Sequence, residues 1–387
     1  MSMIEQFATT KPLTRARCDE AMEFIIRQMD RNLETFADTF PSESSTNQVY
    51  RQVGNVAWTP GFWTGMLWLT YEVTGDEKYR LAAENQLSSY RQRVDERRYT
   101  ETHDLGFLYT LSCVSAYKLT GNEGAKQLAI EAADLLYARY LEKAGIIQAW
   151  GNLNDPKQQG RMIIDCLMNL PLLYWASEVT GDPKYYDAAE AHVHQSAKYL
   201  IREDASSFHT FYMDTQTGEP KYGSTAQGYA DDSCWARGQA WGMYGFPLSY
   251  RYTGDGELIE LTTKLSNYFL NRLPEDLVCY WDLIFTSGPE ERDSSAAAIA
   301  VCGLLETAKH LPLTDPNQRR YENAALSILD SLIAHYLAQE VPESNGILLH
   351  AVYGKPNGTG IDECCIWGDY YFYEALVRVT RDWKPYW

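Results

Sequence analysis

The sequence has few basic residues and no long apolar run, and each absence excludes a class of protein. Lysine and arginine total 34 of the 387 residues against 52 aspartates and glutamates, which gives a net charge of −18. Because nucleic acids and anionic lipid surfaces bind to basic patches, this balance argues against both as partners. No stretch approaches the roughly 20 consecutive apolar residues that a membrane span requires. We therefore expect a protein that binds neither nucleic acid nor membrane.

The N-terminal stretch lacks the organisation of a secretory signal. Residues 1–12 contain no basic region followed by an apolar core, which is the pattern of a signal peptide. We therefore expect a cytoplasmic protein, unless a leader has been removed. The sequence predicts no particular oligomeric state.

Motifs for metal ions, phosphates and nucleophilic catalysis are also missing. The eight cysteines form no C-x-x-C pair and most lie in apolar stretches, so we interpret them as reduced thiols packed in the core. The sequence contains no H-E-x-x-H zinc motif, no P-loop, no G-x-G-x-x-G turn and no nucleophile elbow. These absences favour acid/base chemistry by side chains, with neither a metal ion nor a cofactor.

Aromatic residues, in contrast, are abundant, with 28 tyrosines and 11 tryptophans. Two interpretations of this abundance stay open. Ordinary packing between helices accounts for most such residues, whereas some of them suit the wall of a cleft that binds sugars.

A self-similar turn sets the expected fold. Each of four copies ends in Thr-Gly-Asp or Thr-Gly-Asn, at residues 71–76, 117–122, 177–182 and 250–255, and a looser copy lies at 310–316. Glycine after an apolar helix is the usual left-handed C-terminal cap, and the Asp or Asn that follows is a good N-cap. Each copy therefore predicts a tight helix–turn–helix.

The segments on the two sides of these turns differ in hydrophobicity. Those after the turns are amphipathic at helical spacing: 77–94, 123–141, 183–201, 257–272 and 316–337. Those before the turns are more apolar: 61–73, 104–119, 163–179, 233–252 and 294–311. With 13–40 and 366–380 this gives twelve helices. We predict an all-α protein, an (α/α)6 barrel of six inner and six outer helices in one domain over residues 1–387. An irregular helical bundle is the alternative.

The longer connections indicate where a site should lie. Residues 145–161, 203–232, 276–292 and 340–363 all lead into predicted inner helices, so they should gather at one mouth of the barrel. Aspartate and serine recur where the inner helices begin, and N-capping explains many of them. We favour that role for Asp76, Asp232 and Asp293. His192 and His194, on a predicted outer helix, are interpreted as surface residues.

Asp104 and Asp165 stand apart from the other aspartates. Asp165 lies between Ile164 and Cys166 at the start of an apolar segment, and such surroundings raise the pKa of a carboxyl group, as a general acid requires. Asp104 opens the preceding inner helix, so both side chains could project into one cavity. Paired carboxylates are the usual equipment for acid/base chemistry on sugars. From the spacing alone, capping and catalysis both stay open for this pair.

Eight segments carry a resemblance to a known family, and they occur in that family's order. They are residues 58–68, 103–109, 145–150, 160–173, 209–212, 235–241, 292–296 and 366–371. In these segments the sequence resembles the unsaturated glucuronyl hydrolases of glycoside hydrolase family 88. The resemblance implies a bacterial, cytoplasmic (α/α)6 barrel that removes the unsaturated uronic acid left on oligosaccharides by polysaccharide lyases.

The resemblance also assigns roles to individual residues. It makes Asp165 the acid/base and Asp104 its essential partner. It places eight further side chains around the unsaturated sugar: Trp58, Phe62, His103, Trp150, His209, Gln227, Arg237 and Trp241. The implied chemistry is hydration of a double bond: the acid protonates carbon 4, water adds to carbon 5, and the resulting hemiketal opens and expels the remaining sugar.

Specificity is less well defined by the sequence. Family members that prefer sulfated chondroitin fragments resemble one another in a loop with serine and lysine, whereas residues 354–360 contain no serine. An unsaturated rhamnogalacturonyl hydrolase acting on pectin fragments is therefore an alternative. A sugar epimerase using His103 and His209, and a sugar-binding protein without activity, are further alternatives.

Overall fold

The structure is a computed structural model that describes residues 3–8 and 13–387. Residues 1–2 and 9–12, part of the stretch in which no signal peptide is expected, lie outside the described residues. The chain is mostly helical, as predicted. The α-helices are α1 (Met3–Gln6), α2 (Arg15–Phe36), α3 (Pro60–Thr74), α4 (Glu77–Asp95), α5 (Leu105–Tyr109), α6 (Ser115–Thr120), α7 (Glu123–Tyr137), α8 (Leu170–Thr180), α9 (Pro183–Tyr199), α10 (Ala236–Thr253), α11 (Gly256–Leu270), α12 (Ser294–His310), α13 (Pro316–His335) and α14 (Ile366–Thr380).

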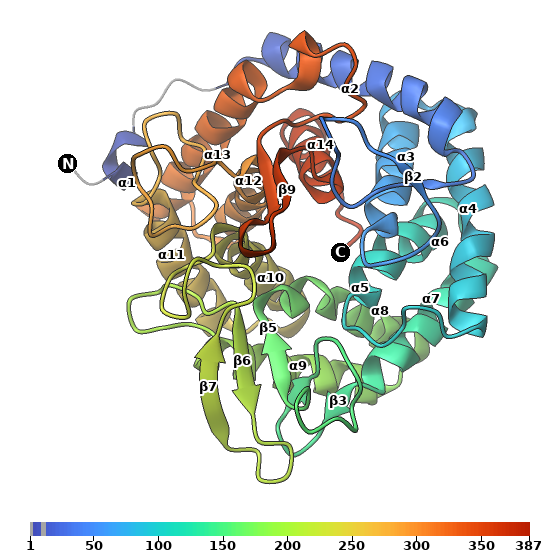
Figure 1. Cartoon of the computed structure of the whole chain (residues 1–387), viewed down its shortest axis with the longest axis vertical. Helices are drawn as coiled ribbons and strands as arrows, with labels where there is room; N and C mark the ends of the chain where they lie inside the picture. Colours follow the sequence, from blue (N-terminus) through green and yellow to red (C-terminus); the bar gives the residue numbers. More distant parts are fainter. Residues whose placement is uncertain (1–2, 9–12) are drawn as a thin grey trace.

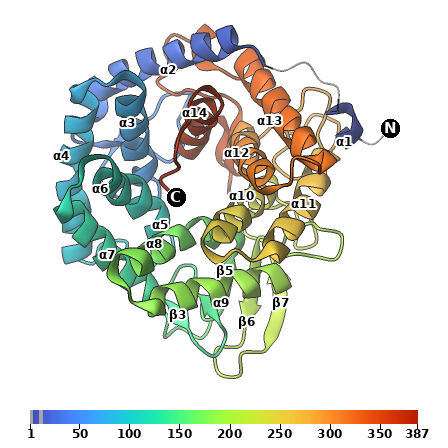
Figure 2. The same cartoon turned by 180° about the vertical axis from the view of Figure 1, so that it is seen from behind.

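Figures 1 and 2 show these helices in two concentric layers around a common centre. The outer layer contains α2, α4, α7, α9, α11 and α13, and the inner layer contains α3, α5 with α6, α8, α10, α12 and α14. Neighbouring inner helices pack on one another, and α14 packs against α3. The inner helices α10, α12 and α14 are buried over most of their length. This burial explains why apolar and aromatic residues occur on every face of these helices, with only a few buried polar residues among them.

The repeated turns fold as the sequence predicts. Gly75, Gly121, Gly181 and Gly254 end their helices in the left-handed conformation, with φ between 70° and 74°. The residue after each glycine caps the next helix with its side chain; Asp76, for example, accepts a hydrogen bond from the Lys78 N–H at 3.0 Å. Glycine is favoured at the left-handed position because it has no Cβ. These turns connect each inner helix to the following outer helix.

Two predicted inner helices are irregular where the sequence predicts continuous ones. The segment 104–119 contains α5, then a π-helical turn at Thr110–Val114, then α6. The segment 163–179 starts as the end of a strand and a 3₁₀ helix, Ile164–Met168, before α8 begins. The 3₁₀ helix contains Asp165, and the π-helical turn follows α5, the short helix that begins after Asp104. Such deviations from regular helix are common at functional sites.

The N-capping predictions for aspartates have mixed outcomes. Asp293 caps α12, as expected, by accepting from the backbone N–H groups of Ser295 and Ala296. The prediction for Asp232 is wrong, because α10 begins only at Ala236 and Asp232 is exposed. Trp235 pairs with Asp282 in a β-bridge, which keeps the chain extended up to that residue.

The segments between the helices contain short antiparallel strands, which the sequence analysis did not predict. They are β1 (Phe40–Pro41) with β2 (Gln52–Val53), β3 (Tyr140–Leu141) with β4 (Ile146–Ile147), β5 (Arg161–Ile163) with β6 (Thr210–Met213) and β7 (Pro220–Ser224), and β8 (Ala351–Gly354) with β9 (Thr359–Glu363). At two to five residues each, they are too short to show an alternating pattern. Strands β5, β6, β7 and β9 lie on the side that faces the viewer in Figure 1.

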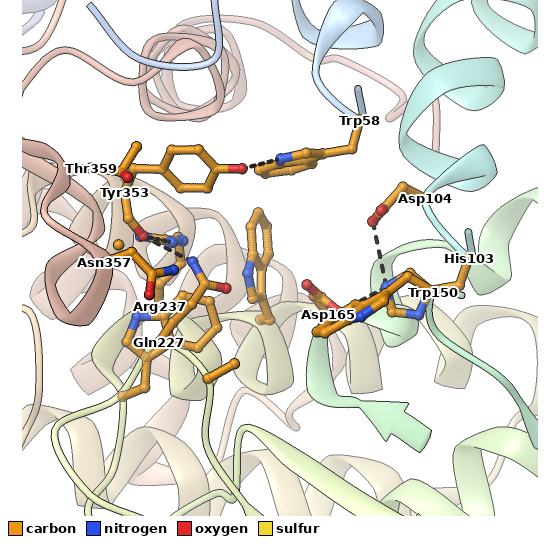
Figure 3. A pocket seen from close by; sticks show the side chains of 14 residues that line it. Trp58, His103, Asp104, Trp150, Asp165, Gln227, Arg237, Tyr353, Asn357 and Thr359 are labelled. Atoms are coloured by element: carbon orange, nitrogen blue, oxygen red, sulfur yellow. Dashed lines mark hydrogen bonds and ion pairs between the residues drawn. The ribbon is translucent and has the colours of Figure 1, made fainter. Parts of the chain in front are cut away.

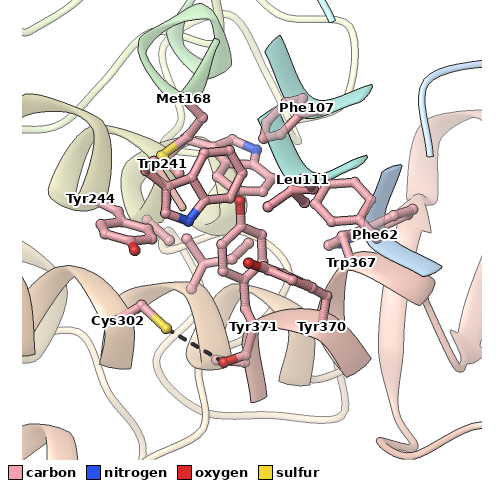
Figure 4. Close-up of a cluster of buried hydrophobic side chains, with 14 of the residues drawn as sticks. Phe62, Phe107, Leu111, Met168, Trp241, Tyr244, Cys302, Trp367, Tyr370 and Tyr371 are labelled. Atoms are coloured by element: carbon pink, nitrogen blue, oxygen red, sulfur yellow. Dashed lines mark hydrogen bonds between the residues drawn. The ribbon is translucent and has the colours of Figure 1, made fainter. Parts of the chain in front are cut away.

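Aromatic side chains fill the centre of the inner layer. Figure 4 shows Phe62, Phe107, Trp241 and Tyr371 among them. The ring of Trp387, in the C-terminal segment, stacks on Tyr371 with the centroids 6.0 Å apart and meets Phe107 edge-on. Large rings packed in this way bury much apolar surface, which stabilises the centre of the fold.

The sequence also predicted packed, reduced cysteines and no membrane-spanning segment. All eight cysteines are buried and free, which agrees with the expectation of packed thiols. Among the described residues, none of the helices combines the length and the hydrophobicity that crossing a bilayer takes.

Candidate active site

A cavity of about 360 Å³ opens at the end of the inner layer where the long connections gather. Its wall combines carboxylates, indole rings and amide groups. The lining residues are Trp58, His103, Asp104, Trp150, Asp165, Ala226, Gln227, Trp235, Arg237, Trp241, Tyr353, Gly354, Asn357 and Thr359. Figure 3 shows that Asp104 and His103 come from the start of α5, and that Tyr353 reaches across to Trp58 from the opposite wall.

The structure brings the two predicted acids together around His103. The Nε2 atom of His103 lies 3.1 Å from Oδ1 of Asp165 and 3.4 Å from Oδ1 of Asp104. The imidazole is 1% exposed, whereas the side chains of Asp104 and Asp165 are 16% and 19% exposed. The Thr102 hydroxyl donates to Oδ2 of Asp104 at 2.6 Å. Both carboxylates can therefore reach a molecule in the cavity, with the histidine held behind them.

Strand β5 places Asp165 at this position. In the antiparallel pair, Ile163 lies opposite Thr210, and the backbone N–H of Ile164 donates to the carbonyl oxygen of His209 at 3.1 Å. The chain then turns into the 3₁₀ helix that contains Asp165. Because a 3₁₀ turn is tighter than an α-turn, the carboxyl group of Asp165 is directed into the cavity before α8 begins.

The electrostatics of the pair differ from the sequence-based prediction. Burial raises the pKa of Asp104, although the nearby His103 opposes this. At Asp165 burial also acts to raise the pKa, but the charge of His103 and its hydrogen bond outweigh burial, so that pKa lies below its ordinary value. The prediction of a raised pKa for Asp165 is therefore wrong, because the sequence does not show that a histidine lies against it. The raised pKa belongs to Asp104.

The two acids favour the charged form of His103. Burial opposes its ionisation, but the charges of Asp104 and Asp165 raise the pKa of the imidazole well above its usual value. The ligand-type atoms of His103, Asp104 and Asp165 lie within 4.8 Å of one another, close enough for a metal ion. When its imidazole is protonated, His103 has no free lone pair at Nε2 and cannot serve as a nitrogen ligand of a metal ion.

Aromatic rings form much of the cavity wall. Trp58 and Trp241 both contact Phe107 beneath them, at 5.5 and 5.3 Å between centroids. Trp150 is 41% exposed at the rim, and the guanidinium of Arg161 lies 4.5 Å from its ring. Flat rings at the base and at the rim suit a sugar, whose C–H groups pack against aromatic faces.

Arg237 is the one predicted cation of this wall, and it is already anchored. It lies 1% exposed, with Nη1 3.1 Å from Asp293 Oδ2 and Nη2 donating to the Tyr353 carbonyl oxygen at 2.6 Å. The amide of Gln227 donates to the same carbonyl at 2.9 Å. The hairpin β8–β9 is therefore fastened to the inner helix α10 at the cavity.

Eight of the ten predicted site residues line the cavity, and two do not. The eight are Trp58, His103, Asp104, Trp150, Asp165, Gln227, Arg237 and Trp241. Phe62 is fully buried beneath Trp58, with the ring centroids 5.5 Å apart. His209 lies behind the wall against Trp235, and burial lowers its pKa to about 4. Both residues therefore support the wall from behind.

Sequence reasoning missed several residues of the cavity wall and the burial of one histidine. Trp235 and the hairpin residues Tyr353, Gly354, Asn357 and Thr359 also line the cavity. Trp235 lies within segment 235–241 of the family resemblance and could have been found there. Tyr353 reaches Trp58 only because β8 folds against β9, and the Trp58 Nε1–H donates to the tyrosine hydroxyl at 3.1 Å. The interpretation of His192 as a surface residue is wrong. It is fully buried because β4 packs against α9, and its Nδ1 accepts from the backbone N–H of Ile147 at 2.8 Å.

The fold and the cavity together define a carbohydrate-active enzyme of the acid/base type. Comparison with known proteins narrows this class. The family model described as Glycosyl Hydrolase Family 88 matches residues 26–383. An unsaturated chondroitin disaccharide hydrolase of Streptococcus pneumoniae is 49% identical over 99% of this chain and 97% of its own length. The chain therefore belongs to glycoside hydrolase family 88.

Solved structures agree with this assignment. The crystal structure of an unsaturated glucuronyl hydrolase from Streptococcus agalactiae matches with a TM-score of 0.97 at 47% identity, over 99% of this chain and 97% of that one. A mutant of the same enzyme complexed with dGlcA-GalNAc6S matches with a TM-score of 0.89 at 44% identity, over 99% and 97% of the two chains. The family and the hydrolase activity predicted from the sequence are thus confirmed.

Proposed function

We propose that this chain releases the 4,5-unsaturated uronic acid from the non-reducing end of glycosaminoglycan-type oligosaccharides produced by lyases. The observation that carries the proposal is the meeting of Asp104, His103 and Asp165 at one cavity lined with indole rings. The similar enzyme that binds dGlcA-GalNAc6S supports the same class of substrate. We further take the chain to be a single catalytic domain with an (α/α)6 barrel, in which the two helical layers supply the six inner and six outer helices.

Asp165 is the proton donor in this proposal. Its carboxyl group transfers a proton to carbon 4 of the double bond, and water adds to carbon 5 as Asp165 takes a proton from that water. The product is a hemiketal at carbon 5, which opens and expels the remaining sugar. One carboxyl group thus acts first as acid and then as base, and it ends the cycle in its starting form.

The pKa of Asp165 is lowered in the enzyme without substrate, and substrate binding reverses this shift, so that the carboxyl group takes up a proton from solvent. The unsaturated uronic acid carries a carboxylate, and a second negative charge within a few ångströms disfavours ionisation of a buried carboxyl group. Asp104, whose pKa is already raised, shares this environment. The imidazolium of His103, in contact with both acids, is placed to pass a proton between them. The cluster then titrates as a unit.

The remaining cavity residues bind and orient the sugar. We assign stacking to Trp58, Trp150 and Trp241, and polar contacts to Gln227 and Arg237. Phe62 and His209 act from behind, by fixing Trp58 and Trp235. These assignments follow the family pattern residue by residue.

The hairpin β8–β9 faces the sugar that is expelled. Gly354, Asn357 and Thr359 line the cavity there. The Lys355 ammonium, the nearest cation on this loop, contacts the carboxylates of Glu291 and Glu290 and is therefore engaged. A loop with neither serine nor a free lysine favours an aglycone without sulfate at this position.

Isotope labelling tests the reaction directly. In heavy water the enzyme should place deuterium at carbon 4 of the released uronate, and in oxygen-18 water the label should enter at carbon 5. An ordinary glycosidase would label carbon 1 and leave carbon 4 unlabelled. Label at carbon 1, or cleavage of saturated glucuronides at a similar rate, would refute the proposed function.

A further inference from the structure

Asp104 occupies the N-cap position of α5 but does not cap that helix. Its side chain accepts no hydrogen bond from the backbone of α5. Asp293 lies at the equivalent position of α12, and its carboxylate accepts from the N–H groups of Ser295 and Ala296 at 3.1 and 3.3 Å. An aspartate at an N-cap normally makes such bonds, because the first N–H groups of a helix have no partner within it. Another group must therefore accept hydrogen bonds from the backbone N–H groups at the start of α5.

That partner is Asn169, which lies on the neighbouring inner segment between the 3₁₀ helix and α8. Its Oδ1 accepts the backbone N–H of Phe107 at 2.7 Å. Phe107 is the third residue of α5, so this is the N–H group that a capping Asp104 would take. Asn169 is fully buried. Its side chain therefore replaces water and the Asp104 carboxylate at the start of this helix.

The same amide group also reaches the second acid. Nδ2 of Asn169 donates to the backbone carbonyl oxygen of Asp165 at 3.2 Å. One side chain thus bridges the helix that begins after Asp104 and the turn that contains Asp165. The two segments touch directly as well: a Cβ on Gly106 would lie 2.3 Å from Cα of Asn169. This close approach leaves little freedom in the separation of the two backbones.

We propose that Asn169 is a positioning residue that takes over the capping of α5 and thereby leaves the Asp104 carboxylate free to face His103 and Asp165. The inference rests on the proposed function, since it concerns the same acid pair. Without the Asn169 oxygen, the buried N–H of Phe107 lacks an acceptor, which is costly. The carboxylate of Asp104, already at the N-cap, then turns to that N–H group and leaves the cavity.

A double-mutant cycle separates this role from mere support of the fold. Asn169→Ala should lower kcat by about tenfold or more, with KM changed by less than about threefold. In an Asp104→Asn background the same substitution should cost less than about threefold, because the carboxylate that it misdirects is already gone. Equal losses of kcat in both backgrounds, or no loss in either, would overturn the inference.

A matched control and a conservative variant complete the experiment. Asn345 is likewise buried and exchanges two hydrogen bonds with the backbone of Tyr50, at 2.6 and 3.1 Å, but it touches neither acid. Asn345→Ala should lower the melting temperature comparably and leave kcat within about twofold. If Asn345→Ala lowered kcat as much as Asn169→Ala, the loss of any buried asparagine would lower activity, and the inference would be wrong.

Asn169→Ser covers the case in which the alanine variant does not fold, since serine is also a good capping residue. The kcat of Asn169→Ser should lie between those of the wild type and Asn169→Ala. Where Asn169→Ala is insoluble, the kcat of Asn169→Ser should lie well above that of Asp104→Asn. A kcat equal to that of Asp104→Asn would contradict a rescue by capping. Failure of the proposed function looks different, because the wild type itself would then not cleave an unsaturated disaccharide.

Discussion

Acids that share a cation occur at both ends of the inner helices, half-buried at the cavity and fully buried at the other end. At the cavity, Asp104 and Asp165 share one histidine. Near the C-terminal ends of α12 and α14, Glu306 and Glu374 share Arg378, with N–O distances of 2.7 and 2.9 Å. All three of these side chains are almost inaccessible to solvent. The second group is called the far-end cluster below.

The difference lies in the cation. The guanidinium of Arg378 keeps its proton at any physiological pH, and its charge outweighs the effect of burial at Glu306, whose pKa is therefore lowered. His103 can give its proton up, so the charge at the cavity can be redistributed among three groups. At the far end the shared cation keeps its proton, although Glu306 also contacts Nε2 of His310 at 3.2 Å. At the cavity the cation between Asp104 and Asp165 is a histidine, so these acids can exchange protons with a substrate.

Replacing one acid at each end should give the largest difference in activity between the two groups. Asp165→Asn keeps the shape of the side chain but removes the exchangeable proton, so kcat should fall by about 10²–10⁴ while binding is largely retained. Glu374→Gln at the far-end cluster makes the same chemical change and should leave kcat within about twofold. Steady-state kinetics on an unsaturated disaccharide measures both. Full activity in Asp165→Asn would remove it from the role of acid.

Removing the arginine should affect stability instead of activity. Arg378→Met leaves Glu306 and Glu374 buried without their main countercharge, which typically costs about 3–5 kcal/mol. Arg251 and Lys309, at 3.8 and 3.9 Å from Glu306, offset part of this. Chemical denaturation should show a lower midpoint, and KM of the folded fraction should be unchanged. A normal midpoint with impaired KM would mean that the far-end cluster acts on the cavity.

A further buried acid, Asp369, has no ion-pair partner among the described residues, and its carboxyl group should make stability depend on pH. Asp369, near the start of α14, accepts hydrogen bonds from the Tyr50 hydroxyl and the Leu348 N–H. Burial raises its pKa to about 7. Between about pH 4 and pH 7 the folded state holds a proton that the unfolded state has lost, so stability decreases as the pH rises, by up to about 4 kcal/mol.

The Asp369→Asn variant tests this dependence. Melting temperatures recorded from pH 4 to pH 7 should fall less steeply with pH than those of the wild type, because the titrating group is gone. Tyr50→Phe, which removes one donor but keeps the carboxyl group, should retain the steep dependence. Parallel curves for the wild type and Asp369→Asn would show that another group is responsible.

The sequence predicted the helical pattern well because that pattern is local. The Gly75 turn and the Asp76 cap depend only on neighbouring residues, and both are present. Asp165 was found because a carboxylate between apolar residues is unusual, and Asp104 because it opens the preceding inner helix. The pKa of Asp165 was not predictable, since it depends on His103, which is 62 positions away in the chain.

Burial by loops was equally hidden from the sequence. The amphipathic pattern of α9 shows which face packs inward, but not that the segment beside β4 covers His192. Burial lowers the pKa of that histidine to about 3, which keeps it neutral. Tyr353 and Thr359 enter the cavity only because β8 pairs with β9, and strands so short leave no periodic signal.

At the rim, removal of an aromatic ring should have a smaller effect than removal of an acid. Trp150→Ala should raise KM with little change in kcat, since stacking on the sugar contributes about 1–2 kcal/mol. Tyr229→Ala is the matched control, because Tyr229 is also an exposed aromatic residue but does not line the cavity. An unchanged KM with a strongly reduced kcat would instead place Trp150 in the chemistry.

Removal of metal ions should have the smallest effect. His103, Asp104 and Asp165 are close enough together to hold an ion, but the raised pKa of His103 favours its protonated imidazole. A metal would have to displace that proton, so its binding would strengthen as the pH rises. Exhaustive dialysis against EDTA should therefore leave kcat and KM unchanged, and added Zn²⁺ should inhibit more strongly at higher pH. If EDTA abolished activity and a single divalent ion restored it, the acids at the cavity would be shown to work through a metal. The far-end cluster could not, because Arg378 already occupies the space between its acids.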